Sequence, residues 1–183
     1  MRVLALSGSL RASSTTRAAL GRALSAAAAA GAETGWADPA GLPWCDGRPV
    51  EAYGPEVAAF RAQLRAADAI LVGSPEYHGS FTGVLKNALD LAGPDDLRGK
   101  LIGLVATARG DAGAMSTLNH LRQVARWVNA WVLPAQVSVP NAQEAFDADG
   151  NVVRESLAAE LDALGKELVR YGRLLGDAPG SGA

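Results

Sequence analysis

Three short apolar runs that lack polar alternation constrain the fold of this chain more than any other feature. They cover residues 3–6, 69–73 and 101–106, and a loop of small and polar residues follows each of them. A helical pattern comes after each loop. Uninterrupted apolar runs are typical of strands that are covered on both faces, as the strands of parallel sheets are. The sequence therefore predicts repeated βαβ units.

The remaining segments extend this alternation along the chain. Two further strands are expected over residues 32–37 and 131–139, the second with a break at Pro134. The helical patterns are those of residues 15–30, 53–67, 82–92, 113–129 and 151–175. We therefore expect an α/β fold with a doubly wound, five-stranded parallel sheet in a three-layer α/β/α sandwich. Ligands of such folds bind beyond the carboxyl ends of the strands, so the loops after the first, third and fourth strands should carry function.

The size of the chain fits one domain. It has 183 residues, of which 49% are apolar, and this is enough for a core of ordinary size. We expect a single domain over residues 1–175. The tail GDAPGSGA, residues 176–183, is small and polar, and we expect it to be disordered.

Charge and cysteine content exclude several classes of function. The formal net charge of −2 provides no basic field for nucleic acid or an anionic membrane, and the alanine-rich residues 23–30 are too few to span a bilayer. Cys45 is the only cysteine, so we expect no cysteine-based metal cluster, no internal disulfide and no metal site. A strand pattern begins at Arg2 without a signal-peptide segment, which favours a cytoplasmic location.

The loop after the first strand has the composition of an anion site. Its sequence, SGSLRASSTT at residues 7–16, leads into a helix whose first N–H groups lack partners. Arg11 adds a permanent charge. The alternative is that residues 13–16 only cap the helix and that Arg11 is solvated, and this loop alone leaves both interpretations open. Because neither a P-loop nor a GxGxxG pattern is present, a single terminal phosphate fits best.

The loop after the third strand is suited to a flat ring. It begins at Pro75, which fixes the course of the chain, and contains Gly79 and Gly83, which have no Cβ to block a ligand. Tyr77 and His78 lie between them. Together the two loops predict a ligand with a phosphate at one end and a flat heterocycle at the other.

At these loops the sequence resembles the NADPH-dependent FMN reductases of the flavodoxin-like fold, a family that includes quinone, azo-dye and chromate reductases. The motifs are GSLRASS at residues 8–14 and PEYHGSFTGVLKNALD at residues 75–90. The resemblance continues through NAWVLP at residues 129–134 and PNAQEAFD at residues 140–147. It implies a flavodoxin-like enzyme with FMN as cofactor and NADPH or NADH as reductant. It also implies a small acceptor (a quinone, an azo compound, free flavin or a metal oxyanion) and a homodimer or homotetramer.

The resemblance also assigns residues to the cofactor. It assigns the FMN phosphate to four side chains of the first loop: Ser9, Arg11, Ser14 and Thr16. Thr15 contributes its backbone. It gives the flavin ring to a second group, largely through main chain: Pro75, Glu76, Tyr77 and His78. The third flavin loop, TARGDAGA, adds Thr107, Arg109 and Gly110. The sequence shows no dedicated site for the 2′-phosphate of NADPH, for which Arg109 is only a candidate, so NADPH and NADH both remain open as reductant. Thr16 and His78 both stand where asparagine is usual in the family.

Several roles remain open at this point. Hydride transfer at flavin N5 requires no protein acid, so no catalytic residue is certain, and His78 is a candidate proton donor. A flavodoxin-type electron carrier without its own turnover is the alternative function, although carriers usually dock through a strongly acidic face. Trp127 and Trp131 are candidates for a subunit interface or for the core. Residues 147–151 should form a turn, and Lys86 and Asp90 a helix-stabilising pair.

Overall fold

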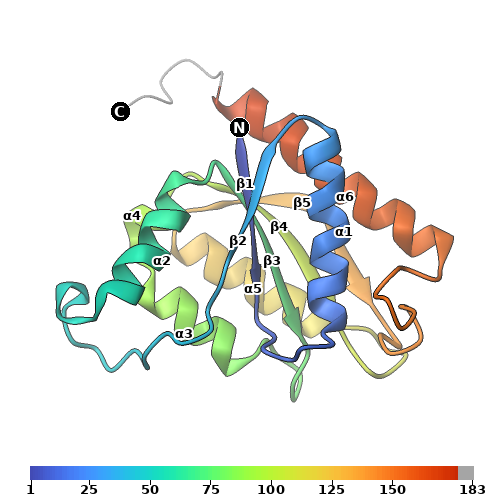
Figure 1. Cartoon of the computed structure of the whole chain (residues 1–183), viewed down its shortest axis with the longest axis horizontal. Coiled ribbons are helices and arrows are strands. Elements are labelled where there is room, and N and C mark those ends of the chain that lie inside the picture. The colour runs from blue at the N-terminus through green and yellow to red at the C-terminus, as the bar shows by residue number, and fades with distance from the viewer. Residues whose placement is uncertain (177–183) are drawn as a thin grey trace.

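The structure, a computed structural model, describes residues 1–176, which form a parallel sheet covered by helices on both faces (Figure 1). Its strands are β1 (Arg2–Ser7), β2 (Glu33–Ala37), β3 (Ala69–Pro75), β4 (Leu101–Thr107) and β5 (Trp131–Val139). Within these residues the sheet has five strands in the order β2-β1-β3-β4-β5. This is the flavodoxin-like order, in which the direction of winding reverses between β1 and β3. The predicted fold class is confirmed.

Helices cover the two faces of the sheet separately. On one face lie α1 (Thr15–Ala29) and α6 (Glu155–Gly176), whose buried residues share one hydrophobic cluster. The other face is covered by α2 (Pro55–Ala66), α3 (Gly83–Leu91) and α5 (Met115–Trp127). Short elements that the sequence did not predict are α4 (Pro94–Leu97) and a 3₁₀ turn at Val50–Ala52.

The two clusters explain why the apolar runs show no alternation. In β1, Val3 and Ala5 pack against α1 and α6, whereas Leu4 and Leu6 pack on the opposite face. All four side chains are buried. Because both faces of the strand are buried, each position requires an apolar residue, as the sequence predicted.

Residues Trp131–Val139 form one strand, and its pairing with β4 is irregular at Pro134, as expected. The register shifts between Ile102 and Leu104 of β4, so that β5 accommodates extra residues around Pro134. Arg122 of α5 donates to the carbonyl oxygens of Leu133 and Pro134 at 2.8 and 2.9 Å. Its guanidinium thus pairs carbonyl groups at the irregularity. A proline is tolerated here because β5 is the edge strand.

The last helix begins later than the sequence indicated. A turn at residues 147–151 precedes it, as predicted, and the Asp147 carboxylate accepts hydrogen bonds from the backbone N–H of Asp149 and Asn151. The hydrogen bond from the Asn151 side chain, together with these backbone bonds, lowers the pKa of Asp147. The helix, α6, starts at Glu155 and ends at Gly176. Residues 177–183 of the predicted tail lie outside the described residues.

The two tryptophans expected in an interface or in the core are not core residues. Trp127 is 80% exposed at the end of α5, and Trp131 is 62% exposed at the start of β5. Both therefore lie at the amino edge of the sheet, opposite the edge that the sequence assigned to ligands. None of the helices in residues 1–176 is long and apolar enough to cross a membrane.

Candidate functional site

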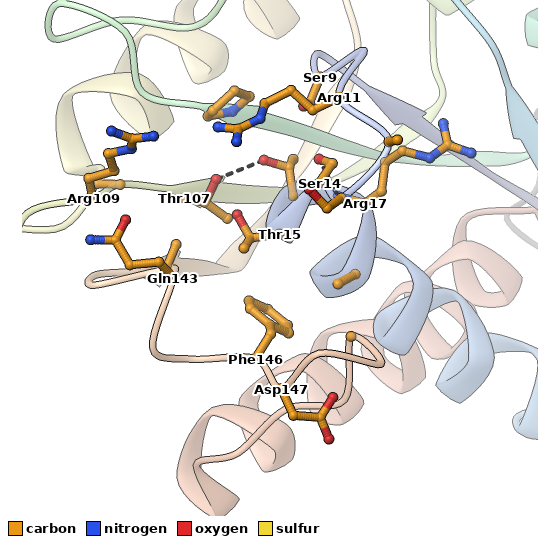
Figure 2. Close-up of a pocket in the computed structure, with 18 of the residues that line it drawn as sticks. Ser9, Arg11, Ser14, Thr15, Arg17, Thr107, Arg109, Gln143, Phe146 and Asp147 are labelled. Carbon is orange, nitrogen blue, oxygen red and sulfur yellow. Dashed lines mark hydrogen bonds between the residues drawn. The ribbon is translucent and has the colours of Figure 1, made fainter.

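A cavity of about 1030 Å³ opens at the carboxyl edge of the sheet (Figure 2). Four segments form it: the start of α1 with the loop before it, the ends of β3 and β4, and residues 142–150. The size is at the upper end of the range of roughly 300–1,000 Å³ that is usual for ligand pockets. Predicted cofactor residues in the lining are Ser9, Arg11, Ser14, Thr15, Thr16, Pro75, Glu76, Tyr77, Thr107 and Arg109.

The β1–α1 loop reaches the cavity by passing close to α3 at Gly8. A Cβ at this position would lie 2.7 Å from the hydroxyl oxygen of Thr82 and 2.9 Å from Cβ of Leu85. Thr82 caps α3, since its hydroxyl accepts from the Leu85 N–H, and the same hydroxyl donates to the Gly8 carbonyl at 2.7 Å. Only glycine permits this approach of the two segments.

The start of α1 faces the cavity with its N–H groups and its partial positive charge. Ser14 is the N-cap and accepts from the Arg17 N–H at 3.1 Å, so the prediction that this segment caps the helix is correct. The first turn of α1 contains no acidic residue. Arg11, on the loop just before, is exposed and forms no hydrogen bond or ion pair within residues 1–176. Capping and anion binding are therefore compatible here.

A buried pair of hydroxyl groups joins the start of α1 to the end of β4. Thr16 and Thr107 share a hydrogen bond of 2.7 Å between their side-chain oxygens, and both residues are almost fully buried. Each hydroxyl has one hydrogen to donate, and their shared bond uses only one of the two. One O–H of the pair thus remains available at the cavity wall.

The Glu76 side chain supports the next loop. Its carboxylate accepts hydrogen bonds from the N–H and the hydroxyl of Thr117, at 3.2 and 3.0 Å, in the first turn of α5. The N-cap residue of this helix, Ala114, cannot supply a side-chain acceptor. Glu76 therefore caps α5 from another loop, and its backbone N–H extends the β3–β4 ladder to Thr107.

The residues after Glu76 form a two-residue hairpin. Tyr77 and Ser80 exchange backbone hydrogen bonds of 2.8 and 3.1 Å, and the Ser80 hydroxyl contacts Nδ1 of His120 at 3.0 Å. His78 and Gly79, at the tip, have φ angles of 52° and 78°. A type I′ turn requires positive φ at both positions, and asparagine adopts it more readily than histidine does. Asparagine at position 78 would therefore fit this backbone with less strain than histidine does.

His78 and Gly110 are the predicted cofactor residues that lie outside the cavity lining described for residues 1–176. His78 is exposed at the tip of its hairpin, and Gly110 is exposed on the β4–α5 loop. The structure thus brings together the side chains predicted from the first loop. It leaves the proposed proton donor at the rim.

One wall of the cavity escaped the sequence interpretation. It consists of residues 142–150, including Gln143, Phe146 and Asp147 (Figure 2). This segment overlaps the matching stretch PNAQEAFD, yet its residue types suggested no chemistry. Arg17 was also missed, and its guanidinium lies 4.4 Å from the ring centre of Trp36.

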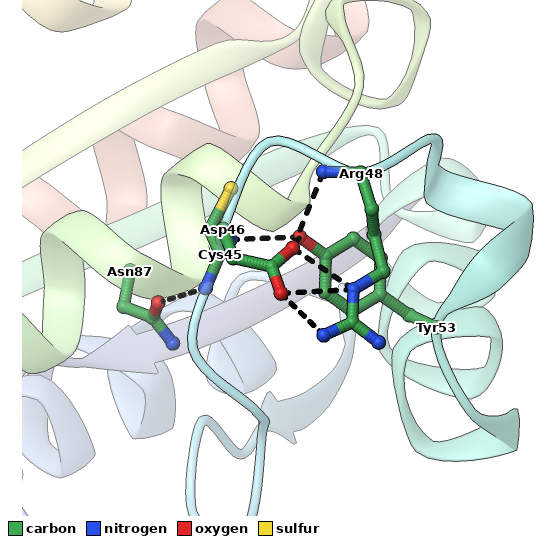
Figure 3. A network of polar contacts seen from close by, with 5 residues as sticks. All are labelled: Cys45, Asp46, Arg48, Tyr53 and Asn87. Atoms are coloured by element: carbon green, nitrogen blue, oxygen red, sulfur yellow. Dashed lines mark hydrogen bonds and ion pairs between the residues drawn. The ribbon is translucent and has the colours of Figure 1, made fainter.

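The loop between β2 and α2 has its own polar network, which includes Asn87 of α3 (Figure 3). Asn87 of α3 accepts from the Cys45 N–H at 2.8 Å and donates to the Pro43 carbonyl at 2.9 Å. Asp46 pairs with Arg48, and this guanidinium lowers the pKa of the carboxyl. Asn87 thus holds this loop in place on α3. The predicted pair on the same helix is also present, with Nζ of Lys86 lying 2.6 Å from Oδ1 of Asp90.

The comparisons with known proteins agree with this geometry. Residues 1–144 match the family model described as NADPH-dependent FMN reductase. An NAD(P)H-dependent FMN reductase of Pseudomonas aeruginosa is 38% identical over 174 residues, which cover 90% of this chain and 93% of that protein. A probable NADPH:quinone oxidoreductase of Oryza sativa is 35% identical over 115 residues, 61% of this chain and 57% of that protein.

Solved structures of flavoproteins share the fold of this chain. The flavoenzyme NAD(P)H:(acceptor) oxidoreductase of Paracoccus denitrificans superposes with a TM-score of 0.79 at 26% identity, over 94% of this chain and 97% of that one. A flavodoxin from the Archaea superposes with a TM-score of 0.68 at 13% identity, over 94% and 99%. At that identity the second likeness concerns the fold alone.

Proposed function

The chain belongs to the NADPH-dependent FMN reductase family and is an FMN-dependent NAD(P)H oxidoreductase, and on this premise we propose that the carboxyl-edge cavity is its flavin site. The FMN phosphate binds at the start of α1. The flavin ring lies along the loops that follow β3 and β4. The match to the reductase family favours an enzyme over a flavodoxin-type carrier.

The phosphate end of the site rests on one observation above all: an unpaired Arg11 stands beside an open helix N-terminus at the same cavity. A phosphate monoester carries close to two negative charges at neutral pH, and it accepts hydrogen bonds from N–H groups and guanidinium. Ser9 and Ser14 add hydroxyl groups, and the Thr16–Thr107 pair adds its spare O–H. The residues present therefore fit the phosphate.

The ring end is supported by a fixed backbone. Pro75, Glu76 and Tyr77 continue from β3, and the hairpin that follows is held on α5 through Thr117 and His120. Thr107 and Gly110 belong to the loop on the other side. Backbone groups held in this way can contact a flat heterocycle without reorganising on binding, which limits the entropic cost. His78 contributes to this end of the site through the backbone of the turn that it occupies.

Bound FMN supplies the redox chemistry, taking a hydride at N5 from the nicotinamide and passing the electrons to a second substrate. The protein's contribution is to hold the ring and to leave one face accessible. One oxygen of the Glu76 carboxylate, Oε2, accepts both hydrogen bonds from Thr117, so this side chain is directed toward α5. Tyr77, 52% exposed at the rim, lies where a second substrate would enter.

The acceptor is a small molecule, and the relatives support a quinone or an azo compound. Free flavin and metal oxyanions remain in the proposed range, because a single exposed ring face with few side-chain donors selects weakly. We also propose a homodimer or homotetramer in the cytoplasm. The resemblance to the family supports the oligomer. A net charge of −2 gives no support to a nucleic-acid partner.

Steady-state kinetics test this function. Because reductant and acceptor use the same ring face in turn, NADPH oxidation with a quinone should give parallel double-reciprocal lines. Oxidised nicotinamide should compete with the quinone. The flavin-free protein serves as the control and should show no turnover until FMN is added. Intersecting lines, which indicate a ternary complex, would contradict the shared face.

A further inference from the structure

The hairpin that follows β3 is attached to α5 at both of its ends. At its start, Oε2 of Glu76 accepts hydrogen bonds from the N–H and the hydroxyl of Thr117, at 3.2 and 3.0 Å. At its end, the Ser80 hydroxyl contacts Nδ1 of His120, about one helical turn further along α5. The contact of Ser80 is exposed, whereas Thr117 is fully buried. Because a hydrogen bond is stronger away from water, Glu76 forms the firmer attachment of the two.

Thr117 itself lies outside the cavity. Glu76 and Tyr77 belong to the cavity lining described for residues 1–176, and Thr117 does not. Both donors of Thr117 bind the same carboxylate oxygen, and the N-cap residue of α5, Ala114, offers no side-chain acceptor in its place. An effect of the Thr117 hydroxyl on a ligand in the cavity must therefore be transmitted by Glu76.

The hydrogen bonds around Glu76 fix a backbone carbonyl group at the cavity. The Glu76 N–H donates to the Thr107 carbonyl at 2.7 Å, and the next N–H, that of Tyr77, donates to the Ser80 carbonyl at 2.8 Å. These bonds and the side-chain attachment set the orientation of the peptide group between Glu76 and Tyr77. Its carbonyl oxygen accepts no hydrogen bond from any residue that the structure describes. An oxidised flavin ring has an N–H group that requires an acceptor once it leaves water, and this carbonyl oxygen is suited to it.

We propose that Thr117 is a positioning residue for the flavin ring. Through Glu76 it fixes the backbone of the β3–α3 loop and thereby determines the affinity of the cavity for the ring, without touching the cofactor. This inference rests on the proposed flavin site. Its effect should be confined to the ring, because the phosphate is assigned to Arg11 and the start of α1, on another loop.

Titration of riboflavin and FMN into the flavin-free protein tests this role without turnover. Thr117→Val keeps the shape of the side chain but replaces the hydroxyl by a methyl group, beside which a carboxylate is unfavourable. Both flavins should bind about three- to tenfold more weakly, since one hydrogen bond is lost, and the ratio of their affinities should stay unchanged. The visible circular dichroism of the bound flavin should also decrease, because the ring is held less firmly.

Two further variants serve as controls. Thr117→Ser retains the hydroxyl and should bind both flavins within about twofold of the wild type. Ser116→Ala removes a hydroxyl from the same turn of α5, but Ser116 is exposed and its hydroxyl forms no hydrogen bond within residues 1–176. It should leave the affinities and the circular dichroism unchanged.

A double variant shows whether Thr117 acts through Glu76. If it does, Glu76→Ala combined with Thr117→Val should bind the flavins no more weakly than Glu76→Ala alone, whereas independent effects would add. Additive losses would overturn the proposal, as would wild-type affinities in Thr117→Val, a loss confined to FMN, or a Thr117→Ser variant as weak as Thr117→Val. A wild-type protein that binds neither flavin would overturn the proposed function itself, and the inference with it.

Discussion

Replacement of Arg11 by alanine is expected to weaken FMN about ten- to a hundredfold and to leave riboflavin affinity almost unchanged. Riboflavin has the same ring without the phosphate, so it does not report on an anion site. Arg11 has no partner in residues 1–176, and a charge-assisted hydrogen bond contributes roughly 1.5–3 kcal/mol. Titration of both flavins into flavin-free wild type and variant measures the difference directly.

The matched control for this prediction is Arg17→Ala. Arg17 lines the same cavity and carries the same charge, but its guanidinium lies over Trp36. Its removal should leave the ratio of FMN to riboflavin affinity unchanged. If Arg11→Ala weakens the two flavins equally, the loop does not bind the phosphate and the orientation of FMN in the cavity is wrong.

Replacement of Gly165 by alanine is expected to lower the free energy of unfolding by about 3 kcal/mol. Gly165 is buried in α6, and a Cβ there would overlap the backbone carbonyl of Ala23 in α1 and lie 3.0 Å from the backbone nitrogen of Ala27. Backbone cannot move aside as a side chain can. The two helices would have to separate, and this would displace the start of α1 at the phosphate site.

Gly83→Ala provides the control for this prediction. It is the same change at the first residue of α3, but no atom lies within 4 Å of the added Cβ. Alanine also has the higher helix propensity, so stability should change by less than about 0.5 kcal/mol. Urea unfolding of both variants makes the comparison. A Gly165→Ala variant as stable as Gly83→Ala would show that the α1–α6 contact adjusts easily.

The fold was largely predictable because its signals are local. Residues 3–6, 69–73 and 101–106 are strands buried on both faces, and burial on both faces produces the uninterrupted apolar run. The boundaries and short elements were less accessible. Helix α4 spans only four residues, Pro94–Leu97, and the late start of α6 depends on hydrogen bonds of Asp147 within its turn.

The site was predictable where one segment carries the chemistry and hidden where several segments must meet. Arg11 is a charged residue next to a helix start, which the sequence displays. Phe146 reaches the cavity only because residues 142–150 pack beside α1 in the folded chain. His78 was considered for its imidazole, whereas the structure points to its positive φ. Glu76 was assigned to the ring largely through its main chain, and the role of its side chain as the cap of α5 was not foreseen.

An anaerobic titration of the FMN-loaded protein with NADPH tests most directly whether this chain moves hydride through a flavin in the carboxyl-edge cavity. The protein should bind about one FMN per chain, and an equimolar amount of NADPH should bleach the flavin absorption. A quinone added afterwards should restore the colour without further NADPH. A protein that takes up no FMN, or whose bound FMN keeps its absorption with both NADPH and NADH, would contradict this account.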